Sequence, residues 1–112
     1  MTATQTATNP VRIYVRESYD NFVSGLSEAD YAKTDHSATK SSYERQLRAQ
    51  IERDFPGAEI EIEWSGASRV SVTTWDPEWS GGAYVDDDKG TRAVDEMRTL
   101  VWEQGTFWVD AN

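Results

Sequence analysis

Alternating apolar and polar residues predict the first strand. Residues 11–16 read Val-Arg-Ile-Tyr-Val-Arg, with β-branched side chains on one face, which is typical of a half-buried strand. Residues 17–34 give mixed signals, so we expect irregular structure there with one helical turn opened by Ser27. The Thr/Ala-rich residues 1–9 show no periodicity, and we expect a disordered tail.

A period of about four residues predicts two helices. Tyr43, Leu47 and Ile51 recur on one face of a helix over about 37–54, which the following Phe-Pro-Gly ends. The second helix spans about 91–104 and is stopped by a glycine. Its apolar positions are Val94, Met97, Leu100 and Val101, its candidate caps are Asp88 and Thr91, and the stop is Gly105. The apolar Phe107-Trp108-Val109 is expected to fold back onto the core.

Two more alternating segments predict a β-hairpin. Residues 58–64 read Ala-Glu-Ile-Glu-Ile-Glu-Trp, and residues 68–74 read Ser-Arg-Val-Ser-Val-Thr-Thr. Pairing them so that isoleucines face valines leaves a three-residue turn and sets Glu63 opposite Arg69. Residues 75–90 are rich in turn formers and predict an exposed loop, with at most a short strand at 83–85.

These elements give the order βαββα. We therefore expect a single small α+β domain over residues 10–112, with an antiparallel-dominated sheet and the helices on one face.

The amino-acid composition excludes most common kinds of catalytic site. The 112 residues contain no cysteine and one histidine, which excludes thiol nucleophiles, thiolate metal sites and every site built on two imidazoles. No nucleophile-elbow or Gly-rich phosphate motif occurs, and no apolar run approaches the ~18 residues that a membrane span needs. We expect a cytoplasmic protein that is no enzyme, uses no cofactor or metal, and binds no membrane.

The net charge of −9 lies almost entirely in the second half of the chain. Residues 1–54 carry eight acids and seven bases (−1), whereas residues 55–112 carry twelve acids and four bases (−8) and all five tryptophans. A proteome-wide acidic bias would place acids in both halves. The asymmetry disfavours direct nucleic-acid binding and favours a basic protein partner.

The succession of elements is similar to that of the DNA-damage-inducible protein I (DinI) family. The resemblance covers roughly residues 11–16 and 43–109: an Arg-Ile-x-Val strand, a helix ending in Phe-Pro, paired strands, and a last helix that carries Trp102 before Phe-Trp-Val. It implies a cytosolic βαββα protein of the kind found on phages and plasmids, which binds the recombinase RecA partly through an acidic last helix. The matching acids here are Asp95, Glu96 and Glu103, diluted by Arg92 and Arg98; segment 17–36 and the long loop 75–90 depart from the pattern.

Glu59, Glu61 and Glu63 form the first candidate site. The strand rise sets them about 6–7 Å apart on one face. Hard-cation ligands converge from several directions, and an exposed flat row does not. We therefore expect either a solvated polar face or a partner surface that imitates spaced phosphates, as a DNA mimic does.

The predicted loop holds two more candidates. Asp86, Asp87 and Asp88 form a charged tip, which is no EF-hand because its glycine comes one position early and Met97 stands where the bidentate Glu belongs. Trp75 and Trp79 are hard to bury together, and aromatic residues are enriched at interface hot spots. Trp64, Trp102 and Trp108 are expected in the core.

Two function classes therefore lead. The first is a modulator or inhibitor of a nucleic-acid-binding protein, either a RecA-like recombinase or a defence complex that phages counter, such as a CRISPR effector or a restriction enzyme. The second is an interaction module or homodimer that uses exposed aromatic residues, with acidity serving only solubility. A salt titration separates them, because an acid-driven complex weakens as ionic strength rises. We rank an enzyme last, since the sequence offers no residue in a recognisable position for a catalytic acid, base or nucleophile.

Overall fold

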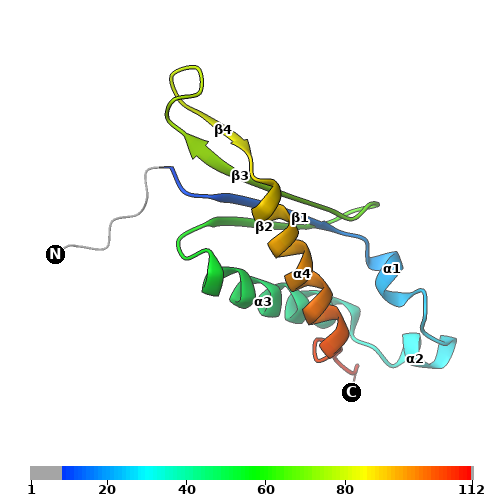
Figure 1. Ribbon diagram of the computed structural model, residues 1–112. Helices are drawn as coiled ribbons and strands as arrows, with labels where there is room; N and C mark the ends of the chain where they lie inside the picture. Colours follow the sequence, from blue (N-terminus) through cyan, green and yellow to red (C-terminus); the bar gives the residue numbers. More distant parts are fainter. Residues whose placement is uncertain (1–8, 112) are drawn as a thin grey trace.

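The computed structural model describes residues 9–111 and shows a small α+β domain. A four-stranded sheet is covered on one face by α3 and α4, as Figure 1 shows. In chain order the elements are β1 (Arg12–Glu17), α1 (Tyr19–Val23), α2 (Glu28–Ala32), α3 (His36–Asp54), β2 (Glu59–Trp64), β3 (Arg69–Asp76), β4 (Ala83–Asp86) and α4 (Asp88–Gln104). The predicted fold class is confirmed. The tail expected over residues 1–9 lies, except for Asn9, outside the described residues.

The strand order corrects the predicted hairpin. The sheet runs β2-β1-β3-β4, so β1 lies between the two strands that we expect to pair. β1 is parallel to β2 and antiparallel to β3, and β3 is antiparallel to β4. The helix α3 returns the chain in the direction of β1, as a crossover between parallel strands requires. This arrangement places the strand with three glutamates at an edge of the sheet, where its carboxylates stay in water.

The isoleucines of β2 and the valines of β3 that we expected to face each other still lie in the same rows across the sheet, with one residue of β1 between them. Ile13 lies between Ile60 and Val72, and Val15 lies between Ile62 and Val70. In the same way, Arg16 of β1 lies between Glu63 and Arg69. The alternation therefore assigns the inner face correctly, because the face depends on each strand's own period and not on its neighbour.

Local capping explains where the helices begin. Asp35 accepts a hydrogen bond from the Ala38 amide (3.0 Å), and α3 starts at the next residue. The predicted turn after Ser27 is confirmed, since the Ser27 hydroxyl accepts from the Asp30 amide (3.1 Å) and opens α2. The irregular structure expected before it is corrected by α1, whose Phe22 is buried in the core.

Most of residues 75–90 is regular structure. The short strand predicted at 83–85 is confirmed as β4, but the loop expected around it is too long. β3 continues to Asp76 and pairs with β4, which leaves residues 77–82 as the connection. The cap of α4 is Asp87, whose carboxylate accepts from the Gly90 amide (2.9 Å), so the helix begins earlier than expected. Turn-forming residues mark the reversal of a hairpin as well as a loop, and composition does not separate the two.

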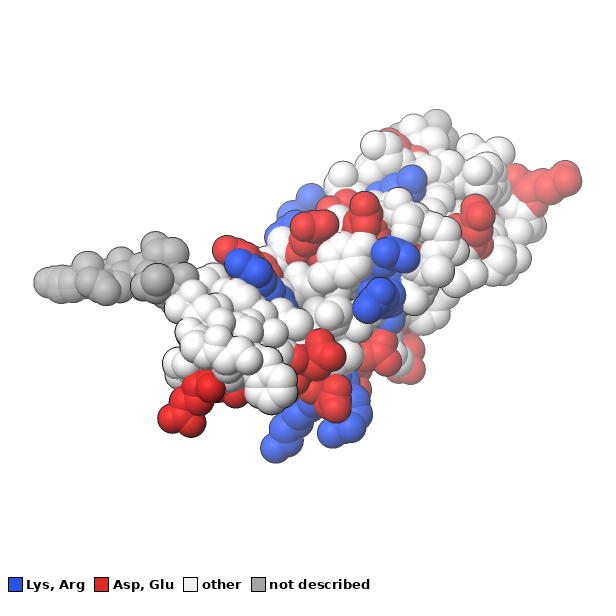
Figure 2. Space-filling model, turned by 90° about the horizontal axis from the view of Figure 1, so that it is seen from above, with Lys and Arg blue, Asp and Glu red and all other residues white. Residues whose placement is uncertain are grey.

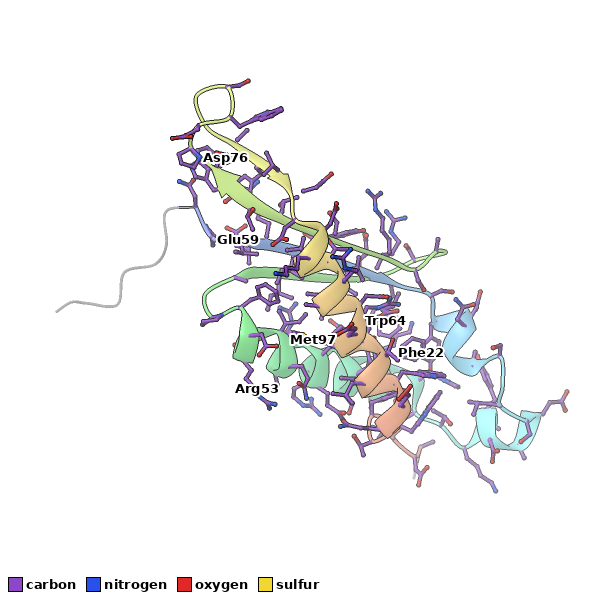
Figure 3. The ribbon with its side chains drawn as sticks, in the orientation of Figure 1. Phe22, Arg53, Glu59, Trp64, Asp76 and Met97 are labelled. Atoms are coloured by element: carbon purple, nitrogen blue, oxygen red, sulfur yellow. The ribbon has the colours of Figure 1, made fainter. Side chains whose placement is uncertain are left out.

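The core fills the layer between the sheet and the two long helices. It comprises Ile13, Val15, Phe22, Tyr43, Leu47, Ile51, Val72, Val94, Met97, Val101 and Phe107. Figure 3 shows Phe22, Trp64 and Met97 in this layer. The C-terminal segment folds back as expected: the Asp35 amide donates to Val109 O (2.8 Å), and Phe107 is fully buried. Trp64 and Trp108 are half-buried, but Trp102 is 42% exposed, which corrects its predicted core position.

Candidate functional site: the outer face of the sheet

The face of the sheet opposite α3 and α4 carries no helix within the described residues (Figure 1). We call it the outer face. Because side chains alternate along each strand, every second residue points to it. It consists of Arg12, Tyr14 and Arg16 from β1, Glu59, Glu61 and Glu63 from β2, Arg69, Ser71, Thr73 and Trp75 from β3, and Tyr84 and Asp86 from β4.

Glu59, Glu61 and Glu63 are exposed along β2, as the alternation predicts, and we call them the glutamate row. Two of the three carboxylates have a partner on β1. Arg12 Nε lies 3.4 Å from Glu59 Oε2, and the Tyr14 hydroxyl donates to Glu63. Both side chains of the Arg12–Glu59 pair are more than half exposed, so solvent screens their attraction.

Arginines beside the row make the outer face mixed in charge. Arg16 Nε donates to the Tyr14 hydroxyl (3.1 Å), and this hydrogen bond raises the pKa of Arg16 above its ordinary value. The whole face carries four acids and three arginines, a net charge of −1. Figure 2 shows acidic and basic side chains side by side there. The acids are thus concentrated along the β2 edge and do not form a uniform anionic surface.

A shallow hollow of about 350 Å³ lies across β1 on this face. Glu59 and Glu61 border it on the β2 side, and Ser71 and Thr73 border it on the β3 side. Arg12 and Tyr14 also line the hollow, so a side chain entering it would meet carboxylate, hydroxyl and guanidinium groups.

Aromatic residues occupy the β3–β4 end of the outer face. The Trp75 and Tyr84 rings meet edge to face at 5.4 Å, and the Arg12 guanidinium lies 3.8 Å above the Tyr84 ring centre. Trp75 also packs so closely over Gly82 that a Cβ there would lie 2.5 Å from the indole ring. Trp75 is therefore held in place and 37% exposed, whereas Trp79 in the connection is 61% exposed.

The three aspartates expected at a loop tip have separate places. Asp86 ends β4 and is exposed, Asp87 caps α4, and Asp88 lies in the first turn of that helix. The tip of the hairpin is instead residues 77–82. The predicted charged tip is therefore wrong, because the Asp87 carboxylate is used by the helix that it starts.

The structure does not bring the acids of α4 together with the glutamate row. Asp95, Glu96 and Glu103 are exposed on α4, which covers the opposite face of the sheet (Figure 1). Asp95 is also paired with Arg98 Nη1 at 2.6 Å. The second half of the chain is acidic, but its acids lie on two sides of the molecule.

A buried ionic cluster escaped the sequence analysis. Glu17 is 1% exposed, and Arg98 donates to both of its carboxylate oxygens at 2.6 Å. The Tyr43 hydroxyl donates to the same carboxylate. Burial, followed by the Glu17 charge and hydrogen bond, raises the pKa of Tyr43, and the hydrogen bond to Glu17 raises the pKa of Arg98. Extending the strand alternation by one residue would have placed Glu17 on the inner face.

This cluster ties together β1, α3 and α4. Glu17 accepts three hydrogen bonds, two at Oε2 and one at Oε1, so most of its hydrogen-bonding capacity is used within the cluster. An open cavity of about 240 Å³ adjoins the cluster, and its further lining residues are Asn21, Phe22, Ser68, Thr99 and Trp102. Arg98, expected to dilute the acidity of the last helix, instead points toward Glu17.

Across residues 9–111, no three His, Cys, Asp or Glu side chains gather in a group that could hold a metal ion. In the same residues no helix is both long and apolar enough to cross a membrane. Neither a protein-family model, nor a curated protein, nor a solved structure matches this chain.

Proposed function

We propose that this protein is a small binding domain that modulates a basic, nucleic-acid-binding protein. The observation that carries the proposal is the glutamate row, which stands exposed along the edge of the helix-free outer face. A fixed row of carboxylates can pair with the cationic groups of a nucleic-acid groove in place of phosphates. The protein would then compete with nucleic acid for that groove.

The distribution of charge supports contact through the β2 edge in particular. The centre of the outer face carries arginines, which would repel a basic partner. On the same face, all the side chains of β2 are glutamates. Glu61 lies in the middle of the row, opposite Tyr14 and not opposite an arginine. The contact that we propose therefore involves only the acidic β2 edge, whereas a full DNA mimic would use the whole surface.

The resemblance to the DinI family supports a RecA-like recombinase as the target. The elements β1, α3, β2, β3 and α4 follow one another in the order of that resemblance, although β2 and β3 are separated by β1 and do not form the paired strands expected there. A defence complex that phages counter, such as a CRISPR effector or a restriction enzyme, offers the same kind of basic groove. The proposal covers both targets, because the recognising chemistry is the same.

Two triple variants of equal charge test the proposal. Glu59→Lys/Glu61→Lys/Glu63→Lys alters the glutamate row, and Glu28→Lys/Glu52→Lys/Asp54→Lys alters exposed acids on α2 and α3, away from the last helix. Each changes the net charge from −9 to −3. The wild type should displace labelled single-stranded DNA from purified RecA, the helix variant should do so nearly as well, and the row variant should fail.

The salt dependence supplies the second readout. Displacement by the wild type should weaken steeply as ionic strength rises, because the contact is between charges. The same variants, used as bait in nuclease-treated bacterial lysate, extend the test to other targets. The proposal is wrong if the row variant retains every nucleic-acid-binding protein that the wild type captures, with an unchanged salt slope and a folded circular dichroism spectrum.

A second candidate is an uncharged interaction module or homodimer, and the exposure of Trp79 favours it. The indole is 61% exposed at the tip of a hairpin that Trp75 and Tyr84 hold in shape. Exposed tryptophans of this kind are frequent binding hot spots. Trp79→Ser should then abolish association that high salt leaves intact, as sedimentation velocity would show.

A further inference from the structure

The open edge of β2 presents unpaired backbone groups. In the parallel pair, the Glu59 amide donates to Val11 O (2.8 Å) and the Ser65 amide donates to Glu17 O (2.9 Å). Odd-numbered residues of β2 therefore direct their backbone groups to β1. Since the pattern alternates, Ile60, Ile62 and Trp64 direct theirs away from the sheet.

One side chain already reaches this edge. Arg48 Nη1 donates to Ile60 O at 3.1 Å. Between residues 9 and 111 no other hydrogen bond to the backbone of Ile60, Ile62 or Trp64 extends from the open side. The edge from Ile62 to Trp64 is thus free to pair with an added strand.

The side chains that flank the edge define what such a strand must carry. On the outer face they are the glutamate row, and on the inner face they are the half-buried Ile60, Ile62 and Trp64. An added strand places its own side chains next to both sets. Lysine or arginine at alternate positions would meet the carboxylates, and apolar residues between them would extend the core.

A second copy of this chain does not fit the same edge. Pairing β2 with β2 would bring two glutamate rows side by side, and like charges on adjacent strands are destabilising. Charged residues on edge strands are a common protection against such self-pairing. The repulsion becomes attraction only when the incoming strand is basic.

We propose that β2 binds an extended segment of a protein partner with alternating basic and apolar residues, which adds as a fifth strand. The inference rests on the proposed function, since it specifies how the basic partner is held. Main-chain hydrogen bonds would supply affinity, and the glutamate row would select the sequence. Antiparallel addition is expected, because that pairing is slightly more stable.

The test uses the unaltered protein and a synthetic peptide, acetyl-Lys-Val-Lys-Val-Lys-Val-amide. In antiparallel addition, the residues opposite Ile60, Ile62 and Trp64 direct their amides to β2, and these are the valines. N-methylation of the valines should therefore weaken binding about tenfold or more, while N-methylation of the lysines should leave it nearly unchanged. Charge and composition are identical in the two peptides.

Parallel addition would reverse the two results, and this outcome also supports strand addition. If the two methylated peptides bind equally well, or both lose binding to the same extent, the proposal of strand addition is wrong. A peptide with the same residues in two blocks, lysines first, is the sequence control and should bind weakly. Binding of the block peptide as tightly as the alternating one would contradict selection by the row.

Hydrogen exchange gives an independent readout on the protein. The amides of Ile62 and Trp64 should become protected when the peptide binds, whereas those of Glu61 and Glu63, already directed to β1, should not change. If methylation has no effect but the row variant still loses its protein partner, strand addition is wrong and the proposed function stands. If the row variant also keeps its partner, both are wrong.

Discussion

Two glutamates on opposite faces of the sheet have the same kinds of neighbour. Glu17, on the inner face, accepts hydrogen bonds from the Tyr43 hydroxyl and the Arg98 guanidinium. Glu63, on the outer face, accepts from the Tyr14 hydroxyl, which in turn accepts from Arg16. The difference is water: Glu17 is 1% exposed, and Glu63 is exposed.

Exposure decides what each arrangement can do. Removing one partner of a buried pair leaves a charge without its counter-charge, so we expect the fold to depend on the Glu17 cluster even where its net contribution is small. An exposed pair is screened and exchanges readily with solvent, so it contributes little to stability. The outer carboxylates are for the same reason available to a binding partner.

The largest expected effect comes from breaking the inner arrangement. Arg98→Ala should lower the free energy of unfolding by about 3–5 kcal/mol, because it leaves the buried Glu17 carboxylate without its counter-charge and with only the Tyr43 hydroxyl donating to it. Arg16→Ala, the matched change on the outer face, should leave it nearly unchanged. Urea denaturation measures both, and equal losses would contradict the distinction between the two faces.

An apolar replacement of the inner cluster sharpens that result. Combining Arg98→Met with Glu17→Met and Tyr43→Phe should recover most of the stability that Arg98→Ala loses, since no buried polar group is left unpaired. If the triple variant is as unstable as Arg98→Ala, packing and not charge explains the loss.

The next largest effect is the difference in stability loss between a substitution at the centre of the core and one at its edge. Leu47 on α3 is fully buried, and Leu47→Ala should cost about 2–5 kcal/mol. Ile60 lies half-buried on the edge strand, so Ile60→Ala should cost less, about 1–2 kcal/mol. Thermal or urea unfolding would show the order, and a reversed order would mean that β2 is not an edge.

High pH offers a smaller test of the inner face. The pKa of Tyr43 is raised above its ordinary value of 10.0 by burial and by Glu17. The folded protein therefore keeps this proton longer than the unfolded chain does, and stability is lost as pH rises above 10, by at most about 1.4 kcal/mol per pH unit. Tyr43→Phe should reduce this slope in urea denaturation at pH values on both sides of 10. An unchanged slope would assign the pH dependence to other groups.

The smallest effect is expected on the outer face. Glu59→Gln removes the exposed pair with Arg12 and should change the unfolding free energy by no more than about 0–1 kcal/mol. A loss as large as that of Leu47→Ala would show that the outer face contributes to stability as the core does.

Much of the fold follows from local pattern. The period of Tyr43, Leu47 and Ile51 locates α3 to within a residue, and the alternation of β2 assigns its glutamates to the outer face. Caps are local as well, although Asp87 and not Asp88 or Thr91 begins α4. These features depend on residues a few positions apart, so the chain's own order contains them.

The candidate site is less fully predictable. The glutamate row was expected, but its neighbours Arg12 and Tyr14 were not, because they reach it only once β1 lies beside β2. The pairing of Glu17 with Arg98 joins residues 81 positions apart, and no local pattern connects them.

The sequence by itself determined the class of the fold, the faces of its strands and helices, and the acidity of its second half. Only the tertiary structure decided that β1 separates β2 from β3, and that the acids of α4 and of β2 lie on opposite sides. A strand's period specifies its two faces but not its neighbour, since the open edges of these strands offer similar hydrogen bonds. The choice among neighbours is made by the packing of helices on the sheet, which involves the whole chain at once.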